Sequence, residues 1–178
     1  VECFDDISCS DLVIDFSQPS STKTILKKCV AAKKPIIIGT TGFTNDDLNE
    51  IREAANLIPI VLAANMSRGM IYLKKSLASF IHHNQDKLRC FIEETHHLEK
   101  VDKPSGTAIE LKKFITEHDK NNFIQDIKIK SYRVANIFGT HKIMFCSDSC
   151  TVCFSHEALS RKIFAEGAII CAKFIYFN

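Results

Sequence analysis

The sequence predicts an α/β protein, in which an incomplete Rossmann-like, doubly wound parallel sheet is joined to an α+β domain with a four-stranded mixed sheet. Short, continuously apolar segments alternate with helical patterns over the first 66 residues, which is typical of a parallel sheet with both faces covered. The segment at residues 127–134 instead alternates between polar and apolar residues, which is typical of a half-exposed strand. With 178 residues and 46% hydrophobic content, the chain can form one large domain or two small ones.

The first 66 residues contain three predicted strands and two predicted helices. The strands are expected at residues 11–16, 35–38 and 58–62. The first helix is predicted from an apolar face that includes Leu26 and Cys29. The second helix is expected to begin at Thr44 or Asn45, both good N-cap residues, and to run to about residue 56. This order of elements predicts parallel strands joined by crossover helices.

The remaining residues predict a second unit with its own sheet. A helix is expected at residues 70–82, a strand at 88–92, a polar loop at 93–107 and a helix at 108–118. Further strands are expected at residues 127–134, 138–146 and 151–155, before a closing helix at 162–176. The four strands would form a mixed sheet with one open face, which favours self-association. We expect residues 1–66 and 156–178 to form a partial dinucleotide-binding domain, and residues 67–155 to form a substrate-binding and oligomerisation domain.

Composition and charge argue against several classes of function. The formal net charge is +2 and the lysines are scattered, so a nucleic-acid partner is not expected. No apolar run approaches the ~20 residues of a membrane helix, so no membrane partner is expected. The chain has eight cysteines, but Cys150 and Cys153 form a C-x-x-C pair without the second pair that a zinc site needs. We therefore expect no metal site and reduced thiols in a cytoplasmic protein.

The polar loop at residues 93–107 concentrates the chemistry of the chain. His96 and Lys100 are side chains whose protons can be tuned towards neutral pH. Gly106 lets the backbone approach a ligand closely, and the following helix start offers N–H donors to a carboxylate. The loop therefore suits a small anionic substrate that must be protonated. Two simpler interpretations stay open: the histidines can be surface residues at a strand end, and Thr107 with Glu110 fits a capping box.

This loop resembles the sequence signature of one enzyme family. The signature of the 4-hydroxy-tetrahydrodipicolinate (dihydrodipicolinate) reductases is similar to the segment His96-His97-x-x-Lys100-x-Asp102-x-Pro104-Ser105-Gly106-Thr107-Ala108. Further similarity to the family lies at residues 15–19, 39–43, 64–69, Arg133, 139–141 and 156–161. His141 and His156 are interpreted as strand residues with polar neighbours, and neither is given a catalytic role.

The resemblance implies an NADH- or NADPH-dependent reductase of lysine and diaminopimelate biosynthesis. Such an enzyme transfers hydride to 4-hydroxy-tetrahydrodipicolinate, a cyclic dicarboxylate, and gives tetrahydrodipicolinate. It implies that His96 and Lys100 donate protons and that His97, Gly106 and Thr107 bind substrate. The implied cofactor-binding residues are Gly39, Thr40, Thr41, Ala63, Ala64, Asn65 and Met66. The family also implies a homotetramer joined through the four-stranded sheet.

One family element is not found in these 178 residues. A Rossmann domain opens with a glycine-rich loop of the form G-x-G-x-x-G that holds the pyrophosphate, and none of the six glycines is so spaced. Either the sequence is part of a longer chain or the protein is shortened. We expect weak NAD(P)H binding by these residues alone. The alternatives left open are a truncated, non-catalytic remnant that still folds and oligomerises, and a different nicotinamide oxidoreductase.

Overall fold

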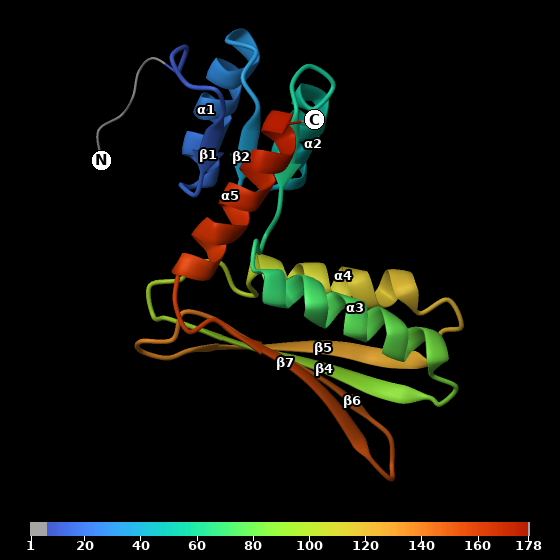
Figure 1. Cartoon of the computed structure of the whole chain (residues 1–178). Coiled ribbons are helices and arrows are strands. Elements are labelled where there is room, and N and C mark those ends of the chain that lie inside the picture. The colour runs from blue at the N-terminus through green and yellow to red at the C-terminus, as the bar shows by residue number, and fades with distance from the viewer. Residues whose placement is uncertain (1–6, 178) are drawn as a thin grey trace. The chain divides into compact units, whose positions relative to one another are not determined.

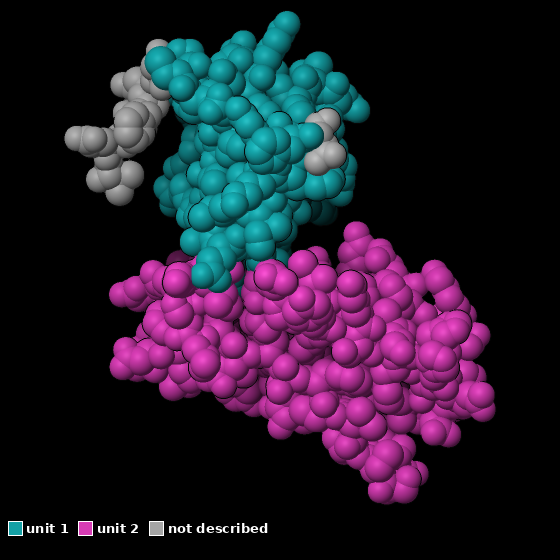
Figure 2. Space-filling model, in the orientation of Figure 1, with its two compact units in different colours: residues 1–66, 164–178 teal, residues 67–163 magenta. Residues whose placement is uncertain are grey.

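The computed structural model describes residues 7–177, and these form a mixed α/β protein with two compact units (Figure 2). Unit 1 contains the residues before Ser67 and those from Phe164 onward, and unit 2 is the segment between them. The elements are, in order, β1 (Val13–Asp15), α1 (Pro19–Ala31), β2 (Ile36–Ile38), α2 (Asn45–Ala54), β3 (Ile60–Leu62), α3 (Arg68–His83), β4 (Leu88–His96), α4 (Gly106–His118), β5 (Ile124–Arg133), β6 (Thr140–Cys146), β7 (Thr151–Glu157) and α5 (Lys162–Phe177).

Unit 1 contains the predicted parallel sheet, in the order β1-β2-β3. Alternate residues of β2 pack on opposite faces, as strand geometry requires. Ile36 and Ile38 join the apolar side chains of α1 and α2 in one core, whereas Ile37 packs with Met66 and Ala168 in another. Thr44 caps α2 in a capping box. Two helices on one face and α5 on the other therefore bury this short sheet.

Gly167 lets α5 pack closely within unit 1. A methyl group added to this glycine would lie 1.8 Å from the carbonyl oxygen of Met66, far inside any permitted contact. The backbone of the segment after β3 therefore lies against the backbone of α5, and only glycine fits between them.

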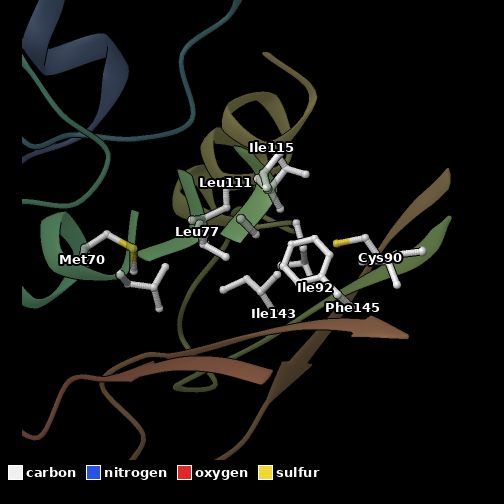
Figure 3. Packing of buried hydrophobic residues seen from close by; sticks show 12 residues of the cluster. Met70, Leu77, Cys90, Ile92, Leu111, Ile115, Ile143 and Phe145 are labelled. Atoms are coloured by element: carbon white, nitrogen blue, oxygen red, sulfur yellow. The ribbon is translucent and has the colours of Figure 1, made fainter. Parts of the chain in front are cut away.

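Unit 2 contains the predicted four-stranded mixed sheet, in the order β5-β4-β6-β7. β4 pairs with β5 in parallel and with β6 antiparallel. The helices α3 and α4 lie side by side over one face of this sheet (Figure 1). Between the helices and the sheet is the main core, in which Leu77, Leu111, Ile92, Ile143 and Phe145 are fully buried (Figure 3).

The boundaries of the strands differ from the prediction, most importantly in β4. This strand was expected to end at Ile92, where the apolar alternation stops, but it continues to His96. Its last residues keep neighbours on both sides, because Glu94 pairs with Ser131 in β5 and with His141 in β6. Strand pairing therefore extends the strand into the polar segment that the sequence assigned to a loop.

Candidate active site

The buried face of β4 changes from apolar to polar along the strand. Leu88, Cys90 and Ile92 belong to the main core of unit 2. Glu94 and His96 continue the same row, since residues two apart on a strand share a face. Both stay buried, with 0% and 7% of their surfaces exposed. A carboxylate and an imidazole thus lie at the end of an apolar core, where each needs a hydrogen-bond partner.

Glu94 is the centre of a hydrogen-bond network. The guanidinium of Arg133 donates from Nη1 to both carboxylate oxygens, at 3.0 and 3.2 Å. The N–H of Ser105 donates to Oε1 at 3.3 Å, and Nδ1 of His96 donates to Oε2. Burial acts to raise the pKa of Glu94, but hydrogen bonds from Ser131, Arg133 and His96 outweigh it and lower that pKa. Glu94 is therefore an ionised carboxylate inside the protein.

His96 lies among groups that act on its proton in opposite directions. Burial lowers the pKa of His96, and the positive charges of Lys100 and Arg133 act in the same direction. The carboxylate of Glu94 opposes them by accepting from Nδ1. The ring of His141 stands edge-on to that of His96, with 5.1 Å between the centroids. His141 itself stays neutral, because burial lowers its pKa to about 3.

The loop that carries Lys100 is fastened to this strand end by Arg133. The guanidinium donates from Nε to the carbonyl oxygen of Lys100 at 3.2 Å and from Nη2 to that of Asp102 at 2.5 Å. The Lys100 ammonium donates in turn to Asp102 Oδ1 at 2.6 Å. The other oxygen of Asp102 accepts from the N–H of Gly106, the first residue of α4, at 3.1 Å. His96, Lys100 and Gly106 thus belong to one network.

The capping-box interpretation of Thr107 and Glu110 is wrong. The N-cap of α4 is Ser105, whose hydroxyl accepts from the N–H of Ala108 at 3.2 Å. Glu110 instead forms an ion pair with Lys74 of α3. Thr107 lies in the first turn of α4, next to Gly106, and is buried.

His97 faces a different part of unit 2. It lines a pocket of about 320 Å³ together with Leu98, Glu99, Arg161 and residues 135–138. Its Nδ1 atom is buried and has no hydrogen-bond partner among residues 7–177. His97 follows the last residue of β4, and its side chain lines this pocket while that of His96 bonds to Glu94.

The predicted cofactor residues lie in unit 1, after the carboxyl ends of β2 and β3. Asp15, at the end of β1, accepts from the hydroxyl of Thr40 at 3.3 Å and from the hydroxyl of Thr22. These bonds connect the loop after β2 with the start of α1. A methyl group on Gly39 would lie 2.2 Å from the Phe16 ring, so only glycine lets the backbone pass this close to the ring. The set Gly39, Thr40, Thr41, Ala63, Ala64, Asn65 and Met66 occupies the edge where parallel sheets bind ligands.

The residues that the structure describes contain neither a metal-binding cluster nor a membrane-spanning helix. Within residues 7–177, no cluster of three or more His, Cys, Asp or Glu side chains is arranged to hold a metal ion. In the same part of the chain, no helix has the length and apolarity needed to cross a membrane.

Comparison with known proteins identifies the family of the chain. The profile described as "Dihydrodipicolinate reductase, C-terminus" matches residues 69–177, and the one described as "Dihydrodipicolinate reductase, N-terminus" matches residues 1–66. The 4-hydroxy-tetrahydrodipicolinate reductase of Alkaliphilus oremlandii is 37% identical, over 93% of this chain and 74% of that protein. The chain belongs to the 4-hydroxy-tetrahydrodipicolinate reductase family. The family comprises NAD(P)H-dependent oxidoreductases of lysine and diaminopimelate biosynthesis.

Other relatives agree with this family and with the fold. The reductase of Rickettsia bellii is also 37% identical, over 92% of this chain and 69% of that protein. Among solved structures, the dipicolinate-bound dihydrodipicolinate reductase of Paenisporosarcina sp. TG-14 superposes with a TM-score of 0.64. That match has 22% identity and covers 94% of this chain and 68% of the other. It supports the reductase fold for both units.

Sequence reasoning missed two residues of this network and left a third without a role. Glu94 was placed in a loop because the strand was expected to end at Ile92, although its i, i+2 spacing from His96 was a usable signal. Arg133 was noted only as a similarity to the reductase family. Asp102 is part of the signature, but nothing local indicates that its carboxylate contacts both Lys100 and Gly106.

Proposed function

We propose that this chain catalyses reduction of 4-hydroxy-tetrahydrodipicolinate to tetrahydrodipicolinate in the cytoplasm, with His96 and Lys100 as its proton donors. The observation that carries the proposal is the network of His96, Lys100 and Gly106 in a member of this reductase family. We assign dinucleotide binding to unit 1 and substrate binding to unit 2. Bound NADH or NADPH supplies the hydride, and the negative charge that develops on the substrate is then protonated by unit 2.

The loops after β2 and β3 are proposed to hold the nicotinamide part of the cofactor. Gly39, Thr40 and Thr41 follow β2, and residues 63–66 follow β3. The fixed position of Thr40, through its bond to buried Asp15, supports a rigid edge at the carboxyl ends of the strands. A rigid loop at this edge would fix the orientation of the nicotinamide ring, which hydride transfer requires.

The start of α4 is proposed to bind one carboxylate of the substrate. Asp102 supports this assignment, because its own carboxylate contacts the Lys100 ammonium and the Gly106 N–H. A carboxylate of the substrate would take its place on these two donors, aided by Thr107 in the first turn of the helix. His97 is proposed to bind the second carboxylate from the pocket that it shares with Arg161.

Substitution of the two proton donors tests the catalytic proposal. His96→Gln and Lys100→Ala should each lower kcat by roughly 10²–10⁴-fold, the usual contribution of a positioned proton donor. The matched controls are His118→Gln and Lys113→Ala, which change exposed residues of α4 and should leave kcat unchanged. Turnover is measured with both NADH and NADPH in a chain that also carries the glycine-rich pyrophosphate loop, because these residues alone are expected to bind NAD(P)H weakly.

Two outcomes would contradict this proposal. Near-normal turnover in the variant with both His96→Gln and Lys100→Ala would remove the catalytic assignment. If the wild-type chain with the glycine-rich loop binds dipicolinate and NAD(P)H by calorimetry but shows no turnover, the protein is instead the non-catalytic remnant.

We also propose that unit 2 mediates assembly into a homotetramer. The face of its sheet opposite α3 and α4 carries the half-buried apolar residues Phe91 and Met144, and the exposed Lys130 and Lys142 lie beside Glu93 of opposite charge. Sheet faces without covering helices are suited to contact with a second copy. Light scattering at micromolar concentration should give the mass of a dimer or tetramer, and a monomer would contradict the proposal.

A further inference from the structure

We propose that Glu94 and Arg133 are positioning residues: Glu94 fixes the ring and the proton of His96, and Arg133 holds the loop of Lys100 to the same carboxylate. This inference rests on the proposed function, in which His96 and Lys100 donate protons. Neither Glu94 nor Arg133 is expected to touch the substrate. Both would act through the donors that they hold.

The first step concerns the tautomer of His96. A carboxylate can only accept a hydrogen bond, so the contact between Nδ1 and Oε2 of Glu94 requires a proton on Nδ1. The neutral ring then has its lone pair on Nε2. A proton that arrives at Nε2 makes the ring cationic, and the adjacent carboxylate stabilises that cation. Glu94 therefore makes Nε2 the atom from which His96 can give a proton.

The second step concerns the surroundings that Glu94 must overcome. His96 is buried, and the charges of Lys100 and Arg133 oppose its protonation. A further titratable neighbour, His141 of β6, is neutral and adds no negative charge. Glu94 is thus the group that favours the protonated form of His96. If an uncharged side chain replaced Glu94, the pKa of His96 would fall, and His96 would lose its proton at lower pH.

The third step concerns Arg133. This guanidinium donates to Glu94 from Nη1, to the Lys100 carbonyl from Nε and to the Asp102 carbonyl from Nη2. A planar fork with five donors can serve all three partners at once, whereas an ammonium on a flexible stem cannot. Arg133 therefore ties the backbone of the Lys100 loop to the carboxylate that His96 also contacts.

Nuclear magnetic resonance of the wild-type protein tests the first step without any variant. The ¹⁵N shifts of His96 distinguish which ring nitrogen carries the proton in the neutral form. We expect a proton on Nδ1, and a proton on Nε2 instead would overturn the role of Glu94. This readout needs no turnover, so it separates a failure of this inference from a failure of the proposed function.

Substitution of Glu94 by glutamine tests the second step. In Glu94→Gln, His96 should titrate at lower pH, and the fall of kcat with rising pH should begin at lower pH. At neutral pH we expect kcat to decrease roughly 10–100-fold, by analogy with the loss when the carboxylate partner of a metal-bound histidine is changed. Glu94→Asp, which keeps the charge, should restore part of the loss. An unchanged pH profile in Glu94→Gln would show that Glu94 is merely structural.

Arg133→Lys tests the third step. It keeps the charge but loses the fork, so we expect a higher KM for the dicarboxylate and an unchanged titration of His96. An unchanged KM would overturn this assignment. The matched control for both variants is Asp119→Asn, because Asp119 is likewise an acidic residue bonded to backbone N–H groups, at 3.0 and 2.7 Å, but it lies at the opposite end of α4. It should move neither the pH profile nor KM.

Discussion

The two ends of β4 bury similar surfaces but in chemically different ways. At one end Cys90 and Ile92 pack against α3 and α4 in a core without directional bonds (Figure 3). At the other end Glu94 and His96 are also buried and make directional bonds to Arg133 and to each other. Apolar packing requires the right volume, whereas the polar end requires particular partners at particular angles. The same strand thus contributes to the apolar core at one end and to the proposed active site at the other.

The largest expected effect is at the polar end. Glu94→Ala removes the carboxylate from the guanidinium of Arg133, whose side chain is only 13% exposed. Breaking a buried ion pair by deleting one partner costs about 3–5 kcal/mol. Urea unfolding of wild type and variant should show this loss in the free energy of unfolding. A loss below 1 kcal/mol would mean that water takes the place of the Glu94 carboxylate. Substitution at the polar end would then cost less stability than substitution at the apolar end.

The apolar end should be next in effect on stability and should have no effect on chemistry. Ile92→Ala removes a fully buried side chain and should lower the free energy of unfolding by about 2–5 kcal/mol. The kcat per folded molecule should not change, because Ile92 belongs to the apolar core of unit 2 and not to the hydrogen-bond network of the proposed donors. Ile92→Val is the graded control, with an expected cost of about 0.5–1.5 kcal/mol. A decrease in kcat in either variant would show that the two ends are mechanically coupled.

The pH dependence of the free energy of unfolding should report on the polar end, where His141 of β6 pairs with Glu94. Burial lowers the pKa of His141 to about 3, whereas an unfolded histidine has a pKa of about 6.5. Between these values the unfolded chain binds more protons, so stability falls as the pH falls. From pH 7 to 5 this one group should cost roughly 2 kcal/mol. His141→Gln should flatten the dependence, and an unchanged slope would place the titration elsewhere.

The smallest expected effect comes from Asp102. Asp102→Asn removes the negative charge that competes for Lys100 and the Gly106 N–H. The dicarboxylate should then bind more tightly by a few-fold, because charge-assisted hydrogen bonds exceed neutral ones by about 1 kcal/mol. Calorimetry with dipicolinate measures the change. Weaker binding would show that Asp102 organises the loop rather than competing with the ligand.

The sequence by itself determined most of the fold and the main chemical motif. Apolar runs and alternation predicted the parallel sheet of unit 1 and the mixed sheet of unit 2, both of which are present. Those patterns are local, because burial on a strand or a helix repeats every few residues. The His-His-x-x-Lys segment was likewise visible without coordinates, and it indicated the reductase family that the comparisons confirm.

Only the tertiary structure decided how the polar residues are connected. Glu94 and Arg133 are 39 positions apart, and they meet because β4 and β5 pair in parallel. Pairing also carried β4 past Ile92 to His96, where no apolar alternation marked a strand. Periodicity records which side of an element is buried, but not which buried polar group will accept the bonds of another. Those partners are fixed by strand register and by the need to satisfy each buried charge.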